Sequence, residues 1–143
     1  MMRENPVPVC SPALLAGRTG LSPDEIAQLP LLQQTTRPYA WRQWFMSLGM
    51  RVERDLTGAR LELFTMLAEA AMHGMGVALI PPFLIRDELQ RGQLVIPFEH
   101  RFISEKAYYL IIPERKSGNV ALGAFRDWIL GEAQTYRDAM GLS

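Results

Sequence analysis

The stretch MLAEAAMHGMGVALIPPFLIRDELQRGQLV, residues 66–95, indicates the fold class of this chain. Its Ala-rich first part predicts a helix over residues 62–73, since small side chains let a helix lie close to a sheet. Gly74 supplies the positive φ that ends such a helix. VALI, residues 77–80, has no polar alternation, as expected of a strand that is covered on both faces.

The second half of this stretch repeats the order of helix and strand. Two prolines end the first strand, because proline cannot donate to a β-ladder. FLIRDELQRG, residues 83–92, predicts a second helix, and QLVIPF, residues 93–98, predicts a second short strand. This alternation is typical of an α/β fold with a mixed, mostly parallel sheet flanked by helices.

Upstream of this stretch, the pattern predicts a short helix and a strand. NPVPVCSPALL, residues 5–15, contains three prolines and is either an edge strand or a connecting segment. LSPDEIAQL, residues 21–29, predicts a helix with Ser22 as its N-cap and Glu25 closing a capping box. LLQQT, residues 31–35, predicts a strand that leads into a loop.

TTRPYAWRQWFMSLG, residues 35–49, predicts a longer helix with one apolar face. Pro38 suits its first turn, and Gly49 suits its left-handed end. We expect the apolar face to pack in the core rather than to stack on a flat ligand. This face consists of Trp41, Trp44, Phe45 and Leu48. ARLELF, residues 59–64, either finishes a strand or begins the next helix.

The C-terminal part predicts a strand and a closing helix. AYYLIIP, residues 107–113, has the clearest strand pattern in the chain. Residues 117–133 predict an amphipathic helix, and the polar residues after Gly131 are expected to fray. The expected buried stripe of this helix is Leu122, Phe125 and Ile129.

Length and charge limit the classes of function. The chain has 143 residues, enough for one domain with a real core. Its 15 basic and 15 acidic residues cancel, which argues against a free-standing nucleic-acid binder, because such proteins cluster an excess of Lys and Arg. The chain has a single cysteine and no signal-peptide pattern, and no apolar run approaches the roughly 20 residues that span a bilayer. These features predict a cytoplasmic protein without a membrane partner.

Catalytic and metal-binding patterns are thin. We expect His73 at a helix C-terminus and His100 in a solvated loop. Cys10 has no activating histidine nearby in sequence, so an idle thiol is expected. No metal-ligand spacing occurs, and Gly74 and Gly76 precede a strand, whereas a dinucleotide-binding loop follows one. An enzyme is therefore the least expected class, and we expect no metal and no cofactor.

Residues ahead of two predicted helices are candidates for holding a small polar molecule. Thr35, Thr36 and Arg37 offer hydroxyls, amide donors and a cation, and helix N-termini bind anions readily. Helix capping explains these threonines equally well. Arg60, Glu62 and Thr65 are similarly placed near the start of the next helix.

Four pieces of the chain carry a resemblance: PVCSPALL, LLQQTTRPYAWRQWFMSLG, ARLELFTMLAEAAMHGMGVALIPPFLIRDELQRGQLVIPF and AYYLIIPERKSGNVALGAFRDWI. They cover nearly the whole chain, and the middle two are the more specific. In this order, they resemble the C-terminal effector-binding (substrate-binding) domain of LysR-type transcriptional regulators. The resemblance is strongest to the branch that contains the glycine-cleavage and β-lactamase regulators.

The resemblance implies a fold similar to type 2 periplasmic binding proteins, in which two α/β subdomains joined by crossover strands hold an effector between them. Residues 7–105 would form the second regulatory subdomain. Residues 106–133 would supply the return strand and C-terminal helix that normally complete the first subdomain, and residues 134–143 would be a tail. The chain is expected to be truncated at its N-terminus, without the first subdomain and without the family's DNA-binding domain. The face of the final helix formed by Leu122, Phe125 and Ile129 would then be left exposed or would find a partner chain.

The resemblance also implies site residues. Leu63, Phe64 and Thr65 would contribute to the effector cleft from a helix start, and Tyr108 would face it from the return strand; ordinary packing is the alternative for Phe64 and Tyr108. The implied function is an effector-sensing regulatory domain that binds a small metabolite and forms homo-oligomers, with DNA bound only through the absent N-terminal domain. Two alternatives stay open: a stand-alone module that forms mixed dimers with a full-length regulator, and a solute-binding fragment.

Overall fold

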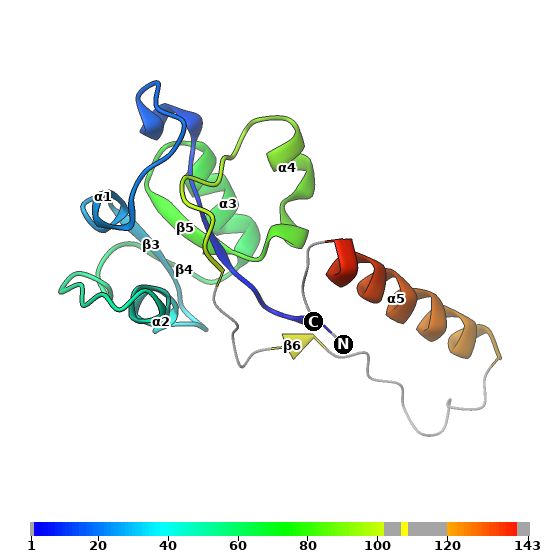
Figure 1. Cartoon of the computed structure of the whole chain (residues 1–143). Coiled ribbons are helices and arrows are strands. Elements are labelled where there is room, and N and C mark those ends of the chain that lie inside the picture. The colour runs from blue at the N-terminus through cyan, green and yellow to red at the C-terminus, as the bar shows by residue number, and fades with distance from the viewer. Residues whose placement is uncertain (1, 102–106, 109–119, 140–143) are drawn as a thin grey trace. The chain divides into compact units, whose positions relative to one another are not determined.

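Figure 1 shows the computed structural model of the chain, which describes residues 2–101, 107–108 and 120–139. The chain divides into two compact units. The larger unit is Asn5–Ile103, and the smaller unit comprises Met1–Glu4 and Ser104–Ser143.

A four-stranded sheet forms the centre of the larger unit. Its strands are β2 (Val7–Val9), β3 (Leu31–Gln34), β4 (Arg60–Leu61) and β5 (Val77–Ile80). Their order is β2-β5-β3-β4, with β2 antiparallel to β5 at one edge and the other two pairings parallel. The predicted mixed, mostly parallel sheet is confirmed, and β2 realises the edge-strand interpretation of the proline-rich start.

Both faces of β5 are covered, as its unbroken apolar sequence predicts. All four of its residues are buried. Ala78 and Ile80 belong to one core cluster, whereas Val77 and Leu79 belong to another, because successive side chains of a strand point to opposite faces. The sheet is therefore a middle layer between two sets of helices (Figure 1).

On the first face, α3 (Phe64–Met72) packs on the sheet through its buried Leu67 and Ala71. The helix predicted over residues 62–73 is confirmed. It begins two residues later than expected because β4 carries the chain in extended form before it. Gly74, with φ of 76°, follows its end as predicted.

The helix predicted over residues 83–92 is shorter than expected. Pro82–Leu84 form a 3₁₀ turn, η2, and α4 spans only Arg86–Gln90. Proline provides no N–H, so the prolines before this segment favour a turn over a continuous α-helix.

The strand predicted over residues 93–98 is wrong. Among these residues only Val95 bridges to the sheet, where its N–H and carbonyl make hydrogen bonds of 2.9 and 3.0 Å with Cys10. Pro97 has no N–H with which to continue a ladder. Its carbonyl instead accepts a 2.9 Å hydrogen bond from the Leu21 N–H.

The opposite face of the sheet is covered by η1 (Pro12–Leu15), α1 (Pro23–Ala27) and α2 (Ala40–Ser47). Ser22 and Glu25 form the predicted capping box at the start of α1. The placement of Pro38 in the first turn of α2 is wrong. Pro38 lies in a separate turn that a 3.2 Å hydrogen bond from the Ala40 N–H to the Arg37 carbonyl closes.

The aromatic face of α2 is core, as predicted. Trp41, Trp44 and Phe45 are fully buried. The Trp41 Nε1–H donates to the Leu32 carbonyl at 3.0 Å, and the Trp44 Nε1–H donates to the His100 carbonyl at 2.9 Å. Both indoles thus satisfy their only donor inside the protein, which leaves them no polar atom for a ligand.

In the smaller unit, β1 (Met2–Arg3) pairs antiparallel with β6 (Ala107–Tyr108), and α5 spans Val120–Ala139. The strand predicted over residues 107–113 is confirmed at its first two positions, and its other positions lie outside the described residues. The helix α5 continues beyond the predicted range of 117–133.

The described part of the apolar stripe of α5 is exposed, which is one of the two outcomes expected for a chain without the first subdomain. Phe125 is 48% exposed and Ile129 is 36% exposed, and Trp128 beside them is 61% exposed. Apart from α5, the described part of the smaller unit contains two short strands, which offer this helix little surface to pack on. The side chain of Leu122 lies outside the described part of the structure.

Gly58 is a position where the backbone leaves no room for a side chain. Its φ is +106°, and a Cβ at this position would collide with the Leu31 carbonyl oxygen of β3. At Gly49, φ is +72° but nothing lies within 4 Å of such a Cβ. Gly58 therefore lets a turn approach the sheet closely, whereas Gly49 only ends α2.

We expect Gly58→Ala to lower the free energy of unfolding by at least about 3 kcal/mol, because left-handed strain adds to a collision with fixed backbone. Gly49→Ala is the matched control and should cost about 1 kcal/mol, because it meets the strain alone. Urea unfolding of both variants measures the difference. Equal losses would contradict the collision at Gly58.

An exposed ion pair beside α1 gives the fold an acid-sensitive contact. Nη1 and Nη2 of Arg18 both donate to the Glu25 carboxylate, which also accepts a 3.1 Å hydrogen bond from the Ser22 N–H. The hydrogen bond from Arg18 above all, and then the bond from Ser22, lower the pKa of Glu25 to about 2.

Because this folded pKa lies below the unfolded value, the contact stabilises the fold fully above about pH 4.3. The stabilisation is lost as the pH falls towards about 2. We expect Glu25→Gln to be less stable than the unchanged chain near neutral pH and to lose less of its stability on acidification. Urea midpoints between about pH 7 and pH 2.5 measure this. An NMR titration that gives Glu25 an ordinary carboxyl pKa would count against the contact.

Candidate functional site

The carboxyl ends of β3 and β4 bring two distant segments of the larger unit together (Figure 1). The strands are parallel, with Gln34 opposite Leu61, so both end at the same edge of the sheet. The Thr35 N–H extends the contact by a 2.9 Å hydrogen bond to the Leu61 carbonyl, and α3 begins shortly after β4. The strand-end site is the set Gln34, Thr35, Thr36, Arg37, Leu63, Phe64 and Thr65.

Arg37 is the cation of the strand-end site. Its Nη1 donates to Gln34 Oε1 and to Thr36 Oγ1, each at 3.0 Å. Its guanidinium carbon lies 4.6 Å from the centre of the Phe64 ring, a cation–π contact. These contacts hold the guanidinium in one position before a ligand arrives, which reduces the entropy lost when an anion binds.

Gln34 ties the two segments of the site together. Its side chain is buried, its Nε2 donates to the Glu62 carbonyl at 3.1 Å, and its Oε1 accepts from Arg37. Its neighbour Gln33 is also buried and donates to two loop carbonyls at 2.9 and 2.8 Å. Sequence reasoning singled out neither residue, although two amides at the end of an apolar strand are a signal of buried polar contacts.

The first turn of α3 presents amide donors at the same edge. Leu63 is the N-cap residue, and no side chain caps this helix in the described structure. The Leu67 N–H, which donates to the Leu63 carbonyl at 3.1 Å, is the first intrahelical donor. The N–H groups of Phe64 and Thr65 precede it, and such groups attract anions at a helix start.

Thr35 and Thr36 do not cap α2. The N-cap of that helix is Tyr39, without a side-chain hydrogen bond. Thr35 Oγ1 instead donates to the Leu61 carbonyl at 3.4 Å, and Thr36 Oγ1 accepts from Arg37. The capping interpretation of these exposed threonines is therefore wrong, and contact with a polar molecule stays a prediction.

Two of the predicted site residues are not joined to this cluster by any described contact. Leu61 packs against the core on the α3 side, so Arg60, its neighbour in β4, projects from the other face of the strand. Tyr108 belongs to the smaller unit, where its backbone pairs with Met2. A role for Tyr108 in effector binding stays a prediction.

Three side chains that are often reactive in enzymes lie outside the strand-end site: Cys10, His73 and His100. Burial raises the pKa of the Cys10 thiol to about 11, which disfavours the nucleophilic thiolate. His73 is the C-cap of α3, as predicted. His100, expected to be solvated, instead packs on Trp44 with ring centres 5.8 Å apart and makes a 2.8 Å hydrogen bond with Ser47.

Two further kinds of site can be checked in the described ranges. Among residues 2–101, 107–108 and 120–139, no three His, Cys, Asp or Glu side chains gather as metal ligands would. Within the same ranges, every helix is too short or too polar to cross a membrane.

The family model of the LysR substrate binding domain matches residues 1–134. The glycine cleavage system transcriptional activator of Escherichia coli (strain K12) is 34% identical over 128 residues, which are 89% of this chain and 42% of the activator. The HTH-type transcriptional regulator TrpI of Pseudomonas aeruginosa is 43% identical over 94 residues, which are 64% of this chain and 32% of TrpI. The chain thus spans about two-fifths or less of the length of these curated relatives, which are transcriptional regulators and not enzymes.

Solved structures agree with the sequence relatives. The effector domain of the transcriptional regulator AmpR of Pseudomonas aeruginosa matches with a TM-score of 0.83 and 26% identity over 97% of this chain and 66% of that domain. The AmpR effector binding domain from Citrobacter freundii matches with a TM-score of 0.70 and 23% identity over 94% of this chain and 66% of that chain, which shows a shared fold. The predicted fold and the resemblance on which it rested are both confirmed. The chain belongs to the LysR substrate-binding domain family.

Proposed function

We propose that this chain senses a small-molecule effector and that the strand-end site forms one wall of the effector's binding site. The observation that carries the proposal is Arg37, held by Gln34 and Phe64 beside the uncapped first turn of α3. A fixed guanidinium and amide donors at one edge suit a carboxylate or another anionic group, because charge-assisted hydrogen bonds are the strong ones.

The rest of this wall offers both polar and apolar surface. The hydroxyls of Thr35, Thr36 and Thr65 are exposed, and a hydroxyl can donate or accept as the ligand requires. Leu63 is 58% exposed and adds apolar surface at the start of α3. A role for Tyr108 in effector binding is proposed on the family resemblance alone.

The proposed regulatory effect is a shift of population. An effector that binds one arrangement of a regulator better than another moves the protein towards that arrangement. A net charge of zero suits a sensing role better than direct DNA contact, so the proposed DNA contacts lie in another part of the regulator. The names of the relatives, a transcriptional activator and a transcriptional regulator, support this assignment.

We expect small carboxylates to bind with a Kd above about 1 mM, because the strand-end site is open and tight sites enclose most of their ligand. A two-dimensional NMR screen of amino acids, small carboxylates and cell-wall fragments should shift residues 34–37 and 61–66. Arg37→Gln should abolish the response to carboxylates. Arg86→Gln removes an exposed arginine on α4 and is the matched control. Shifts that gather elsewhere, or binding that survives Arg37→Gln, would refute this wall.

We also propose that the chain associates with a second copy, as the resemblance implies. The exposed aromatic side chains of α5, Phe125 and Trp128, support such an association, since apolar side chains gain by being covered. Sedimentation should give a mass that rises with concentration from 16.2 kDa towards twice that value. Trp128→Ser should weaken the association, whereas Tyr39→Ser, at an exposed aromatic residue of the larger unit, should not. A monomer at every concentration would refute this proposal.

A further inference from the structure

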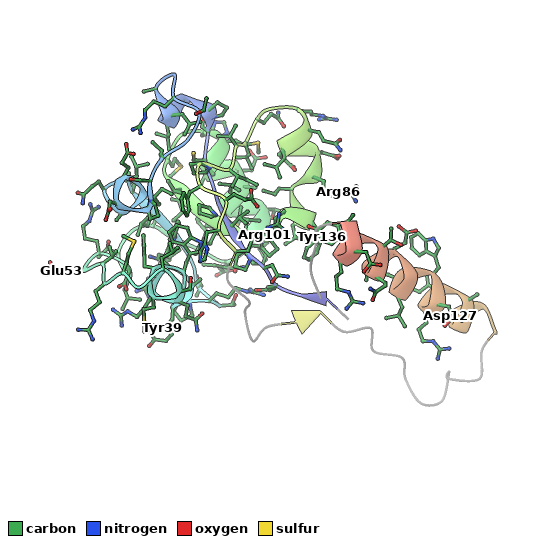
Figure 2. The ribbon with its side chains drawn as sticks, viewed as in Figure 1. Tyr39, Glu53, Arg86, Arg101, Asp127 and Tyr136 are labelled. Atoms are coloured by element: carbon green, nitrogen blue, oxygen red, sulfur yellow. The ribbon has the colours of Figure 1, made fainter. Side chains whose placement is uncertain are left out.

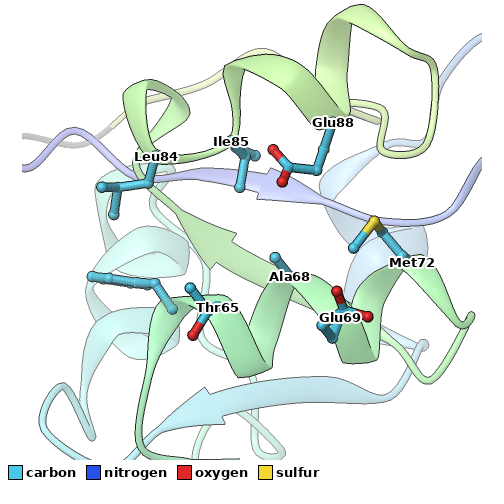
Figure 3. Close-up of a pocket in the computed structure, with 8 residues that line it drawn as sticks. Thr65, Ala68, Glu69, Met72, Leu84, Ile85 and Glu88 are labelled. Carbon is cyan, nitrogen blue, oxygen red and sulfur yellow. The ribbon is translucent and has the colours of Figure 1, made fainter.

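A groove between α3 and α4 lies within the larger unit and has a volume of about 190 Å³ (Figure 3). Its lining is mostly apolar. Ala68 and Ile85 are buried within it, and Phe64, Met72 and Leu84 complete its apolar surface. A cavity of roughly 150 Å³ holds one benzene ring, so this groove has room for one ring or one branched aliphatic group.

Two carboxylates face this apolar surface from different helices. Glu88 points from α4 towards α3, and Glu69 lies on α3 (Figure 3). Within the described residues, the Glu69 carboxylate lies 3.6 Å from Nε2 of His73, which forms an ion pair only when the imidazole is protonated, and the Glu88 carboxylate has no ion-pair partner. Thr65 is the other polar residue of the lining. An apolar hollow that carries negative charge from two sides is complementary to a cation with an apolar body.

Figure 2 labels Glu53 and Arg86, two charged side chains of the larger unit, and neither belongs to the groove lining. Arg86 opens α4 and is exposed, but it is not part of the groove lining. The charged side chains that line the groove are therefore both acidic. Because both charges are negative, the groove favours a cationic ligand over a neutral or anionic ligand of similar shape.

We propose that the groove binds an organic monocation, an ammonium group on an apolar body of about one ring. The ammonium would lie between Glu69 and Glu88, with the body over Ala68 and Ile85. Such a ligand is opposite in charge to the carboxylate proposed for the strand-end site, so the two sites would select different ligands. They share two residues, Phe64 and Thr65, and the Phe64 ring also contacts the Arg37 guanidinium.

The probe is 2-phenylethylammonium, and the readout is the ε-methyl NMR signals of the eight methionines. Titration to about 20 mM should shift Met72, which lines the groove, and leave Met66, which is exposed elsewhere on α3, unchanged. 2-Phenylethanol and phenylacetate keep the ring without the positive charge and should bind at least about fivefold more weakly. Equal binding of the alcohol, a shift at Met66 without Met72, or no shift at Met72 would each overturn the proposal.

Substitutions test the two carboxylates directly. Glu69→Gln and Glu88→Gln should each weaken probe binding about two- to fivefold. Asp87→Asn removes an exposed carboxylate of α4 outside the lining and should change it less than about twofold. If neither glutamine variant weakens binding more than Asp87→Asn does, the assignment is wrong.

Two further variants separate this site from others. Ala68→Leu fills the groove from α3 and should abolish the Met72 response; circular dichroism checks that it folds, and the glutamine variants decide the matter if it does not. Arg37→Gln removes the proposed effector contact and should leave probe affinity within about twofold. If the effector proposal fails, the expected binding of the probe to the groove is therefore unaffected. Loss of probe binding in Arg37→Gln would overturn the independence of the groove.

Discussion

The parallel pairing of β3 with both β4 and β5 is the constraint on which the rest of the larger unit depends. It lets β5 share its backbone hydrogen bonds between β2 and β3, so that an entirely apolar strand can lie at the centre with both faces covered. It also makes β3 and β4 end at one edge. The loop after Gln34 and the start of α3 therefore meet, although they are far apart in sequence.

Buried amides hold this edge together in a way that apolar packing does not. Gln33 and Gln34 lie next to each other in β3, and each connects the strand to a segment more than twenty residues away. A buried amide that loses its partner costs about 1–3 kcal/mol, so these contacts favour one register of the neighbouring loops. The hydrogen bond from Arg37 to Gln34 thereby sets the position of the Arg37 guanidinium, and so of its positive charge, at this edge of the sheet.

The elements that could be predicted from sequence are those with local causes. The capping box at Ser22 and the apolar run of β5 depend on near neighbours, and both were found. The second strand over residues 93–98 failed because pairing depends on a distant partner, which only Val95 has. The site was predicted only in part, because some of its residues act through partners that are distant in sequence. A position before a helix indicated Thr35 and Thr65, but Gln34 acts through a carbonyl 28 residues away. The acidic groove depends on how α3 and α4 face each other, which periodicity does not report.

The three tryptophans occupy two contrasting environments. Trp41 and Trp44 are completely enclosed in the larger unit, whereas Trp128 of the smaller unit is 61% exposed. An enclosed indole emits at shorter wavelength than a hydrated one, so one fluorescence spectrum carries separate signals from the two units. The Trp44 indole also bonds to the His100 carbonyl, close to where the chain leaves the larger unit. The fluorescence of the enclosed indoles is therefore sensitive to the structure around residue 100, without any added label.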